Sequence, residues 1–462
     1  MFSYFKSEKH NIRKEAGLTL KIGLPVIIAQ LLQMSMNFVD TVMAGNLSAQ
    51  TLAAVAVGGA VFTPLIMLAA GILMAVTPII AQLVGARNLD EIGVNVRQAL
   101  WLSQIMAIPI FFLLRNLEIV MIFLDVTPTI IPVAQSYLNA ISWGVFGIFG
   151  YMALRFFNEG MSVTRPAMYV ALLGLLVNIP GNYILMYGKL GLPALGAAGT
   201  GYSSAISGFA MFLGMLIFTM NHKPYDRFDI FSSIKLPDWH YAKEILRVGI
   251  PIGLSSTMEV TMFAVVSLLM GSLGAAAVAG HQVALNFAAM MFMVPFGLSI
   301  AITTRVGNAV GKNSIFDARF RGYVGIGLAT LFMSFTGVII YLFPGAITDI
   351  YTDDVAVKEV AISLLYMAAI FQISDGLQVS SYGALRGLKD TKIPMIVNFI
   401  AYWLVGLPLG YYLGIMKGVG PQGLWIGLIA GLTIAAILHN IRFYVLTKSK
   451  KVSPVHHPTE SI

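Results

Sequence analysis

Cysteine is absent from the 462-residue sequence, and charged residues make up only 11% of it. Without cysteine the chain forms no disulfide, no thiolate metal site and no cysteine nucleophile. Polar stretches are scarce as well, because 57% of the residues are hydrophobic and the mean hydropathy is +0.81. This composition is typical of an integral membrane protein and excludes a soluble globular domain.

Long apolar runs recur along the whole chain, separated by Gly, Pro and polar clusters. A helix that crosses the bilayer needs about 20 apolar residues. The sequence therefore predicts an all-α polytopic membrane protein with twelve transmembrane helices, the second and eighth of which are long enough to bend. The expected spans are 17–44, 51–82, 98–115, 132–154, 167–188, 197–220, 243–272, 277–304, 322–344, 357–383, 394–415 and 421–446.

The distribution of Lys and Arg predicts the orientation of these helices, because positively charged loops stay in the cytoplasm. With both termini in the cytoplasm, 25 of the 29 basic residues lie on that side. We expect a multi-pass protein of the inner (plasma) membrane whose immediate partner is the lipid bilayer. The net charge of +8 then reflects topology and attraction to anionic headgroups. Because no compact basic face is visible, no nucleic-acid partner is expected.

The chain carries an internal duplication. A shift of 226 positions places Gly23 on Gly249 and Pro25 on Pro251, and 15 of the 66 residue pairs over 23–88 and 249–314 are identical. A later match, Gly160 with Gly387, is one residue out of phase.

Six helices in each half is an even number, so both halves enter the membrane the same way round. This arrangement occurs in carriers whose two bundles rock about a central site, and such a carrier is expected to work as a monomer. The predicted parts are a cytoplasmic tail at 1–16, an N-lobe at 17–220, a cytoplasmic linker at 221–242, a C-lobe at 243–446 and a second cytoplasmic tail at 447–462.

Three acidic residues, Asp40, Glu259 and Asp375, lie within apolar runs, whereas the others fall in tails, loops or helix ends. A carboxylate inside the membrane is costly, so it marks a functional site by default. The structural alternative is an ion pair with a Lys or Arg of a neighbouring helix. We expect no basic residue at comparable depth, and therefore predict that the acids bind a coupling cation, either sodium on oxygen ligands or a proton.

Polar residues accompany these acids. Asn178 and Asn182 are four positions apart, so both amides lie on one helix face and can turn toward Asp40. Hydrogen bonding between helices is the structural alternative for the two amides, and His281 by itself is more typical of a hydrogen-bonded core histidine. The further candidates for a supporting polar role are Gln282, Asn286, Gln378, Thr200 and His281.

Six spaced motifs resemble the NorM branch of the multidrug and toxic compound extrusion (MATE) transporters, and the match runs from about the first helix to the twelfth. The resemblance implies two pseudo-symmetric six-helix lobes and a cation-driven antiport cycle that needs no cofactor. It also implies export of bulky, often cationic drugs. The motifs are FVDTVMAG at 38–45, NIPGNYI at 178–184, MEVTMF at 258–263, AGHQVALNF at 279–287, FQISD at 371–375 and LRGLKDTK at 385–392.

The resemblance also implies roles for individual residues. Glu259 and Asp375 correspond to C-lobe carboxylates that bind sodium or a proton, and Asp40 to an N-lobe acid flanked by Asn178 and Asn182. This chain departs from some relatives at Phe371, where they carry Tyr and therefore an additional hydroxyl ligand.

Other functions fit the sequence less well. The segment at 308–313 lacks the first glycine and the final Ser/Thr of a phosphate-binding loop, and no motif of an intramembrane enzyme is present. A channel would not explain the duplicated halves. The serious alternative is a flippase for lipid-linked precursors with a related two-lobed fold. Such a protein is expected to line its cavity with basic residues, whereas this sequence offers acids.

Overall fold

The computed structural model describes residues 11–123, 125–231 and 236–448. The predicted tails at 1–16 and 447–462 and the predicted linker at 221–242 lie partly outside this range. The described chain is helical, and its elements are α1 (Ile12–Leu47), α2 (Ala49–Met74), α3 (Val76–Ala86), α4 (Asp90–Leu114), α5 (Glu118–Phe123), α6 (Ile131–Ser142), α7 (Gly144–Gly160), α8 (Arg165–Tyr187), α9 (Ala197–Asn221), η3 (Lys223–Phe228), α10 (Trp239–Gly271), α11 (Ala275–Gly311), α12 (Ile315–Leu342), α13 (Pro344–Asp349), α14 (Val355–Gly387), α15 (Lys392–Asn398), η4 (Phe399–Gly406), α16 (Leu407–Tyr411), η5 (Tyr412–Met416) and α17 (Pro421–Lys448).

Eleven helices in the described chain are long and apolar enough to cross a membrane, and the bent pair α6 and α7 makes a twelfth. The predicted all-α fold with twelve spans is thereby confirmed. The span expected at 132–154 is not one straight helix, because α6 and α7 meet at 47°. At this bend, a Cβ on Gly144 would lie 2.7 Å from the Cα of Ala205, so only glycine allows α7 to approach α9 so closely.

Two of the longer runs differ in how they accommodate their length. The second run breaks at Ala75, between α2 and α3, whereas the eighth stays one helix, α11, through Pro295. The span over 392–416 changes twice into π-helix, at η4 and η5, on either side of Pro408. Proline has no N–H to donate to the preceding turn, and π-helical segments often occur at functional sites.

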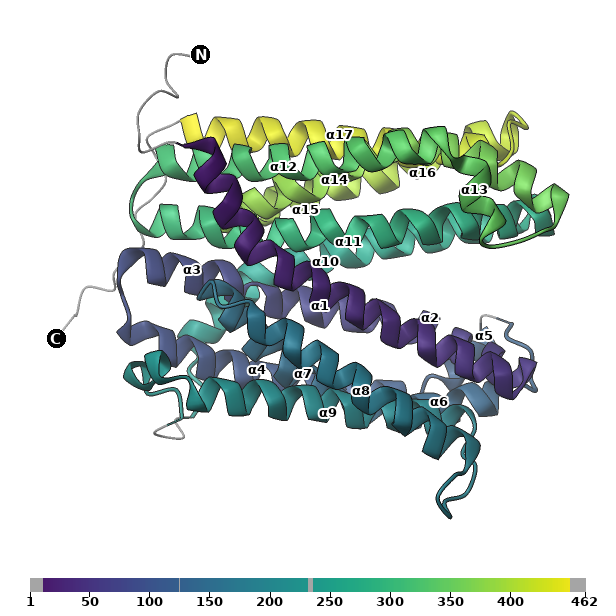
Figure 1. The fold of residues 1–462 in the computed structure, drawn as a ribbon, viewed down its shortest axis with the longest axis horizontal. Helices are drawn as coiled ribbons and strands as arrows, with labels where there is room; N and C mark the ends of the chain where they lie inside the picture. The colour runs from purple at the N-terminus through teal and green to yellow at the C-terminus, as the bar shows by residue number, and fades with distance from the viewer. Residues whose placement is uncertain (1–10, 124, 232–235, 449–462) are drawn as a thin grey trace. The chain divides into compact units, whose positions relative to one another are not determined.

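The chain forms two compact units. One unit consists of Met1–Ile27, Ala81–Asn88 and Leu254–Ile462. Within it α14 contacts α11, α12 and α17, and these helices run side by side (Figure 1). Its core is apolar and includes the fully buried Trp425, which packs against Phe371.

The other unit consists of Ile28–Ile80 and Leu89–Gly253. In this unit α9 contacts α6, α7 and α8, while α7 also contacts α4 (Figure 1). A Cβ on Gly147 of α7 would meet the backbone nitrogen of Phe209 at 2.8 Å, so α7 and α9 are in backbone contact there. Small residues at such crossings let helices pack closely inside a membrane.

The duplication is visible in matching contacts inside the two units. Thr77 Oγ1 donates to the backbone oxygen of Phe156 at 3.1 Å. Thr303, which lies 226 positions later, donates to the backbone oxygen of Gly383 at 2.8 Å. Gly383 in turn lies 227 positions after Phe156, as the phase shift in the sequence predicts. The two halves therefore share one internal packing scheme.

Candidate functional site

Asp40, near the end of α1, lies in a pocket of neutral hydrogen-bond donors. Its Oδ1 accepts from Asn178 Nδ2 at 3.0 Å and from Asn182 Nδ2 at 2.5 Å, and its Oδ2 accepts from Ser204 Oγ at 3.0 Å. The Asp40 side chain is only 9% exposed. The structure thus brings the predicted Asp40, Asn178 and Asn182 together, and these three hydrogen bonds add no positive charge.

Helices α8 and α9 position these donors. Asn178 and Asn182 lie one turn apart on α8, where Asn182 Nδ2 also donates to Asn178 Oδ1 at 3.3 Å. Ser204 on α9 was not among the predicted residues, although its spacing of four from Thr200 puts both hydroxyls on one helix face. Thr200 is fully buried, and its hydroxyl has no hydrogen-bond partner among the described residues.

Tyr137, from α6, is another neighbour that the sequence did not reveal. It is buried, and it lies close enough to Asp40 for the two side chains to interact electrostatically. Nothing in the spacing of the α6 sequence pointed to this contact, because it depends on how α6 packs against the other helices of the unit.

The two C-lobe acids form one cluster. Glu259, on α10, is half-buried, and Asp375, on α14, is 4% exposed. The charge of Glu259 acts on Asp375. Tyr402 of η4 lies close enough to interact electrostatically with both carboxylates. The structure therefore unites the two acids that the sequence predicted and adds Tyr402, a residue from the π-helical segment.

Arg386 lies in the last turn of α14, near a helix end as the sequence predicted, but it is buried. It is 3% exposed, its Nη2 donates to Ser299 Oγ at 2.8 Å, and its charge acts on Glu259. The sequence did not predict this burial, because hydropathy ended the span at 383, whereas α14 extends to Gly387 and its last turn is buried.

The charges of this cluster do not cancel. When Glu259, Asp375 and Arg386 are all ionised, two carboxylates and one guanidinium leave one negative charge. A buried net charge is costly in a low-dielectric interior. The cluster can therefore take one monovalent cation or one proton.

The predicted supporting residues on α11 and α14 lie in different environments. Gln378 is 1% exposed and lies on α14 one turn after Asp375. Gln282 and Asn286 of α11 are exposed. A role for these three side chains in binding a cation stays a prediction.

His281 has hydrogen-bonding neighbours at both ring nitrogens. Trp425 Nε1 donates to its Nδ1 at 3.1 Å, and its Nε2 lies 3.0 Å from Ser267 Oγ. Because Nδ1 accepts, the neutral ring carries its proton on Nε2 and donates it to Ser267. His281 is fully buried, and this geometry matches a core histidine.

Phe371, where some relatives carry Tyr, belongs to an aromatic cluster. Its ring centroid lies 6.1 Å from that of Phe263 and 5.5 Å from that of Trp425. The side chain is 3% exposed. This position therefore supplies apolar packing one turn before Asp375 and no oxygen ligand.

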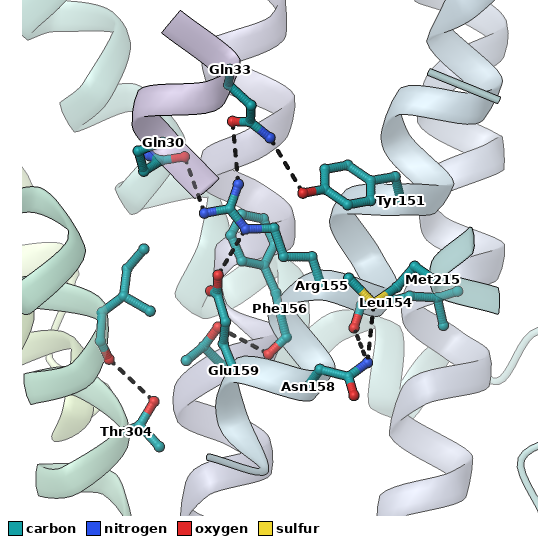
Figure 2. Close-up of polar contacts among 12 residues, drawn as sticks. Gln30, Gln33, Tyr151, Leu154, Arg155, Phe156, Asn158, Glu159, Met215 and Thr304 are labelled. Carbon is teal, nitrogen blue, oxygen red and sulfur yellow. Dashed lines mark hydrogen bonds and ion pairs between the residues drawn. The ribbon is translucent and has the colours of Figure 1, made fainter. Parts of the chain in front are cut away.

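A second buried charged cluster lies on α1 and α7, where the sequence predicted only a helix end (Figure 2). Arg155 Nε donates to Glu159 Oε1 at 2.7 Å, and both side chains are at most 6% exposed. Arg155 Nη1 donates to Gln33 Oε1 at 3.3 Å, and Nη2 donates to Gln30 Oε1 at 3.1 Å. Gln33 Nε2 in turn donates to Tyr151 Oη at 3.3 Å.

Glu159 lies in the last turn of α7, at a helix end as the sequence predicted, but its side chain is fully buried. The span expected at 132–154 ended one residue before Arg155, but α7 continues to Gly160 and buries both charges. The spacing of four between Arg155 and Glu159 was the available signal, since residues so spaced meet on one helix face.

The described residues contain no group of three or more His, Asp or Glu side chains that could hold a metal ion. The side chains that could receive a monovalent cation are the C-lobe carboxylates and the Asp40 group. In this chain such an ion would be transported cargo and not a resident cofactor.

A duplicated all-helical chain with carboxylates buried in both halves has the features of a membrane transporter. The family model of MatE matches residues 25–184 and 251–412. The chain therefore belongs to the MatE (MATE) family, whose members are transporters and not enzymes. The two matched segments begin 226 residues apart, which agrees with the internal repeat.

Curated relatives match nearly the whole chain. The "Multidrug resistance protein MdtK" of Yersinia pseudotuberculosis is 42% identical over 439 residues, which cover 94% of this chain and 96% of the relative. The protein of the same name from Yersinia enterocolitica has the same identity and coverage.

Solved structures share the fold. The eukaryotic MATE transporter AtDTX14 has a TM-score of 0.87 at 19% identity and covers 95% of this chain and 98% of its own. A MOP superfamily transporter from Pyrococcus furiosus has a TM-score of 0.84 at 22% identity, with 95% and 97% covered. These similarities establish the two-lobed fold of the chain.

Proposed function

We propose that this protein is a secondary active multidrug efflux antiporter. It exports organic, largely cationic amphiphilic compounds in exchange for Na⁺, or for H⁺ in the same role. Support comes from the multidrug resistance proteins to which the chain is 42% identical. The protein acts as a monomer in the inner (plasma) membrane with both termini in the cytoplasm, as the distribution of basic residues predicts.

The observation that carries this proposal is the unbalanced charge of the C-lobe cluster. Glu259 and Asp375 are two carboxylates, and among the described residues the one basic side chain whose charge acts on Glu259 is Arg386. A coupling cation that binds there removes the net charge, and a cationic drug is attracted by the same carboxylates. Ion and drug therefore compete, and an inward ion gradient can drive the drug out by displacing it.

Asp40 is proposed as a second cation-responsive carboxylate, with Asn178 and Asn182 as its fixed donors. Its three hydrogen bonds come from neutral groups, so a bound cation or proton would compensate its charge. The predicted N-lobe, 17–220, and C-lobe, 243–446, would then each carry one carboxylate site. Alternating access arises from movement of one lobe against the other.

The decisive experiment uses proteoliposomes loaded with a fluorescent organic cation. A sodium gradient and a pH gradient are imposed separately on wild type, Glu259→Gln and Asp375→Asn. We expect one gradient to drive efflux in the wild type and the two variants to lose at least about tenfold in rate, which corresponds to the lower range of coupling energies.

Asp353→Asn is the matched control, because the Asp353 side chain is fully exposed outside the membrane-spanning helices. It should transport like wild type. Undiminished ion-driven efflux in both C-lobe variants would refute the proposal. If neither gradient moved the dye in the wild type, the flippase would be favoured, and transport of anionic lipid-linked compounds would be measured next.

A further inference from the structure

The guanidinium of Arg155 occupies a site built from oxygen atoms on α1 and α7 (Figure 2). Its three nitrogens donate to three different acceptors, on Glu159, Gln33 and Gln30. A carboxylate and two amide oxygens are the kind of ligands that hard monovalent cations prefer. The site therefore has the composition of a cation site, and the cation in it is part of the chain.

The repeat relates this site to the C-lobe cluster. With the shift of 226, Gln33 corresponds to Glu259, and with the shift of 227 that applies after the phase change, Arg155 corresponds to Tyr382. The guanidinium of Arg155 donates to Gln33. A positive charge thus lies beside the N-lobe counterpart of Glu259, where the C-lobe has a neutral phenol.

One turn further along the helix, the corresponding residues of the two lobes carry charges of opposite sign. Glu159 in the N-lobe corresponds to Arg386 in the C-lobe. The charges of Arg155 and Glu159 cancel, whereas Glu259, Asp375 and Arg386 retain one negative charge. Since a buried net charge is costly, the C-lobe cluster requires an added cation and its N-lobe counterpart does not.

We propose that Arg155 is a built-in cation that fills the N-lobe counterpart of the Glu259 site and so excludes the coupling ion from it. Arg155 is then a specificity-determining residue, which confines ion binding at this level of the repeat to the C-lobe. Removing the guanidinium opens a monovalent cation site formed by Glu159, Gln33 and Gln30. The inference rests on the proposed function only in treating the C-lobe cluster as a cation site.

The test isolates the N-lobe site by neutralising the other three acids with Asp40→Asn, Glu259→Gln and Asp375→Asn. Arg155→Gln is added to this background, and binding of radioactive sodium to the purified protein is measured at mildly alkaline pH. We expect this variant to gain about one bound sodium per protein, because the Glu159 carboxylate has lost the positive charge of Arg155. The measurement needs no transport, so it can fail independently of the antiport proposal.

Two further variants in the same background serve as controls. Arg155→Lys keeps a positive charge and should gain no sodium. Arg155→Gln combined with Glu159→Gln removes both charges, which keeps the site neutral and the helices packed, and should also gain none. These controls separate a cation site from a general loosening of the protein.

A site that prefers a proton to sodium is detected by the pH dependence of the melting temperature. Glu159 faces Arg155 and Tyr151 on its own helix. Without Arg155, ionisation of Glu159 costs stability, so the Arg155→Gln variant should be most stable at low pH and lose stability as pH rises. The variant that also carries Glu159→Gln should lack this dependence.

The inference is supported if Arg155→Gln gains sodium binding or the low-pH stabilisation and the gain disappears with Glu159→Gln. It is overturned if Arg155→Gln gains neither. It is equally overturned if Arg155→Lys gains as much, or if the gain persists when Glu159 is replaced.

Discussion

The two halves of the chain treat buried charge differently at corresponding positions. In the N-lobe, Arg155 donates to Glu159 and to two glutamines, and its charge is cancelled within a single helix. In the C-lobe, the charge of Arg386 acts on Glu259, and the charge of Glu259 acts on Asp375 of another helix. One cluster is neutral and closed, and the other is short of one positive charge.

The two halves differ in charge although they share the same helix packing. The hydrogen bonds from Thr77 and from Thr303 fix the same pair of helices in each unit. Because these packing contacts hold the backbone, the polar side chains nearby can differ without a change of fold. Duplication thus supplied two copies of one scaffold, and the placement of a few charges distinguishes their chemistry.

The largest expected effect comes from breaking the neutral cluster. Arg155→Gln leaves Glu159 without the guanidinium donor to its Oε1, and removal of one partner from a buried ion pair typically costs about 3–5 kcal/mol. The cost is high also because an acid in the last turn of α7 is unfavourable to the helix dipole. Thermal unfolding of the purified protein measures the loss.

Glu159→Gln in the same chain should restore most of this stability, since no unpaired charge remains. Equal melting temperatures for Arg155→Gln and the doubly substituted protein would contradict the assignment of a buried ion pair.

The shared framework is tested next, by equivalent substitutions in both halves. A Cβ on Gly160 would lie 2.8 Å from Ile80 Cβ, and a Cβ on Gly387 would lie 2.7 Å from Val306 Cβ. Both substitutions to Ala should therefore destabilise by about 1–3 kcal/mol through overpacking. Gly327→Ala is the control, because a Cβ there meets no atom within 4 Å and alanine is the better helix former. A loss in only one half would show that the packing is not equivalent.

A smaller effect is expected from Arg386→Gln, which sharpens the charge comparison. Without its guanidinium the C-lobe cluster carries two negative charges, so its affinity for the coupling cation should rise by roughly tenfold. The tighter-bound ion is released more slowly, and the rate of efflux therefore falls. Sodium or proton binding measured together with efflux distinguishes this outcome from simple damage, which lowers both, and Arg386→Lys should retain near-normal affinity.

The smallest effect is expected from Ser204→Ala, beside Asp40. Ser204→Ala removes one neutral hydrogen bond to Oδ2, worth about 1 kcal/mol, and leaves both asparagine donors in place. Ion-driven efflux should fall by less than about tenfold, measured beside Asp40→Asn, which should lose more. A loss with Ser204→Ala as great as that with Asp40→Asn would make Ser204 a principal ligand.

Several features of the site followed from the sequence. Asp40, Glu259 and Asp375 were recognisable because a carboxylate in an apolar run is rare. The contact between Asp40 and the asparagines was predictable because residues four apart share a helix face. The charged partners of the acids were not, since Arg155 and Arg386 lie just beyond the apolar runs, where hydropathy cannot show whether the last helical turn is buried.

The sequence by itself determined the class of protein, the number of spans, the duplication and the three acids, because hydropathy, periodicity and repeats are local properties of the chain. Only the tertiary structure decided which charges neutralise one another. The pairing of Arg155 with Gln30 and Gln33 joins residues more than a hundred positions apart. Such pairings depend on how whole helices pack, and that packing sets the burial and the electrostatic environment of each side chain.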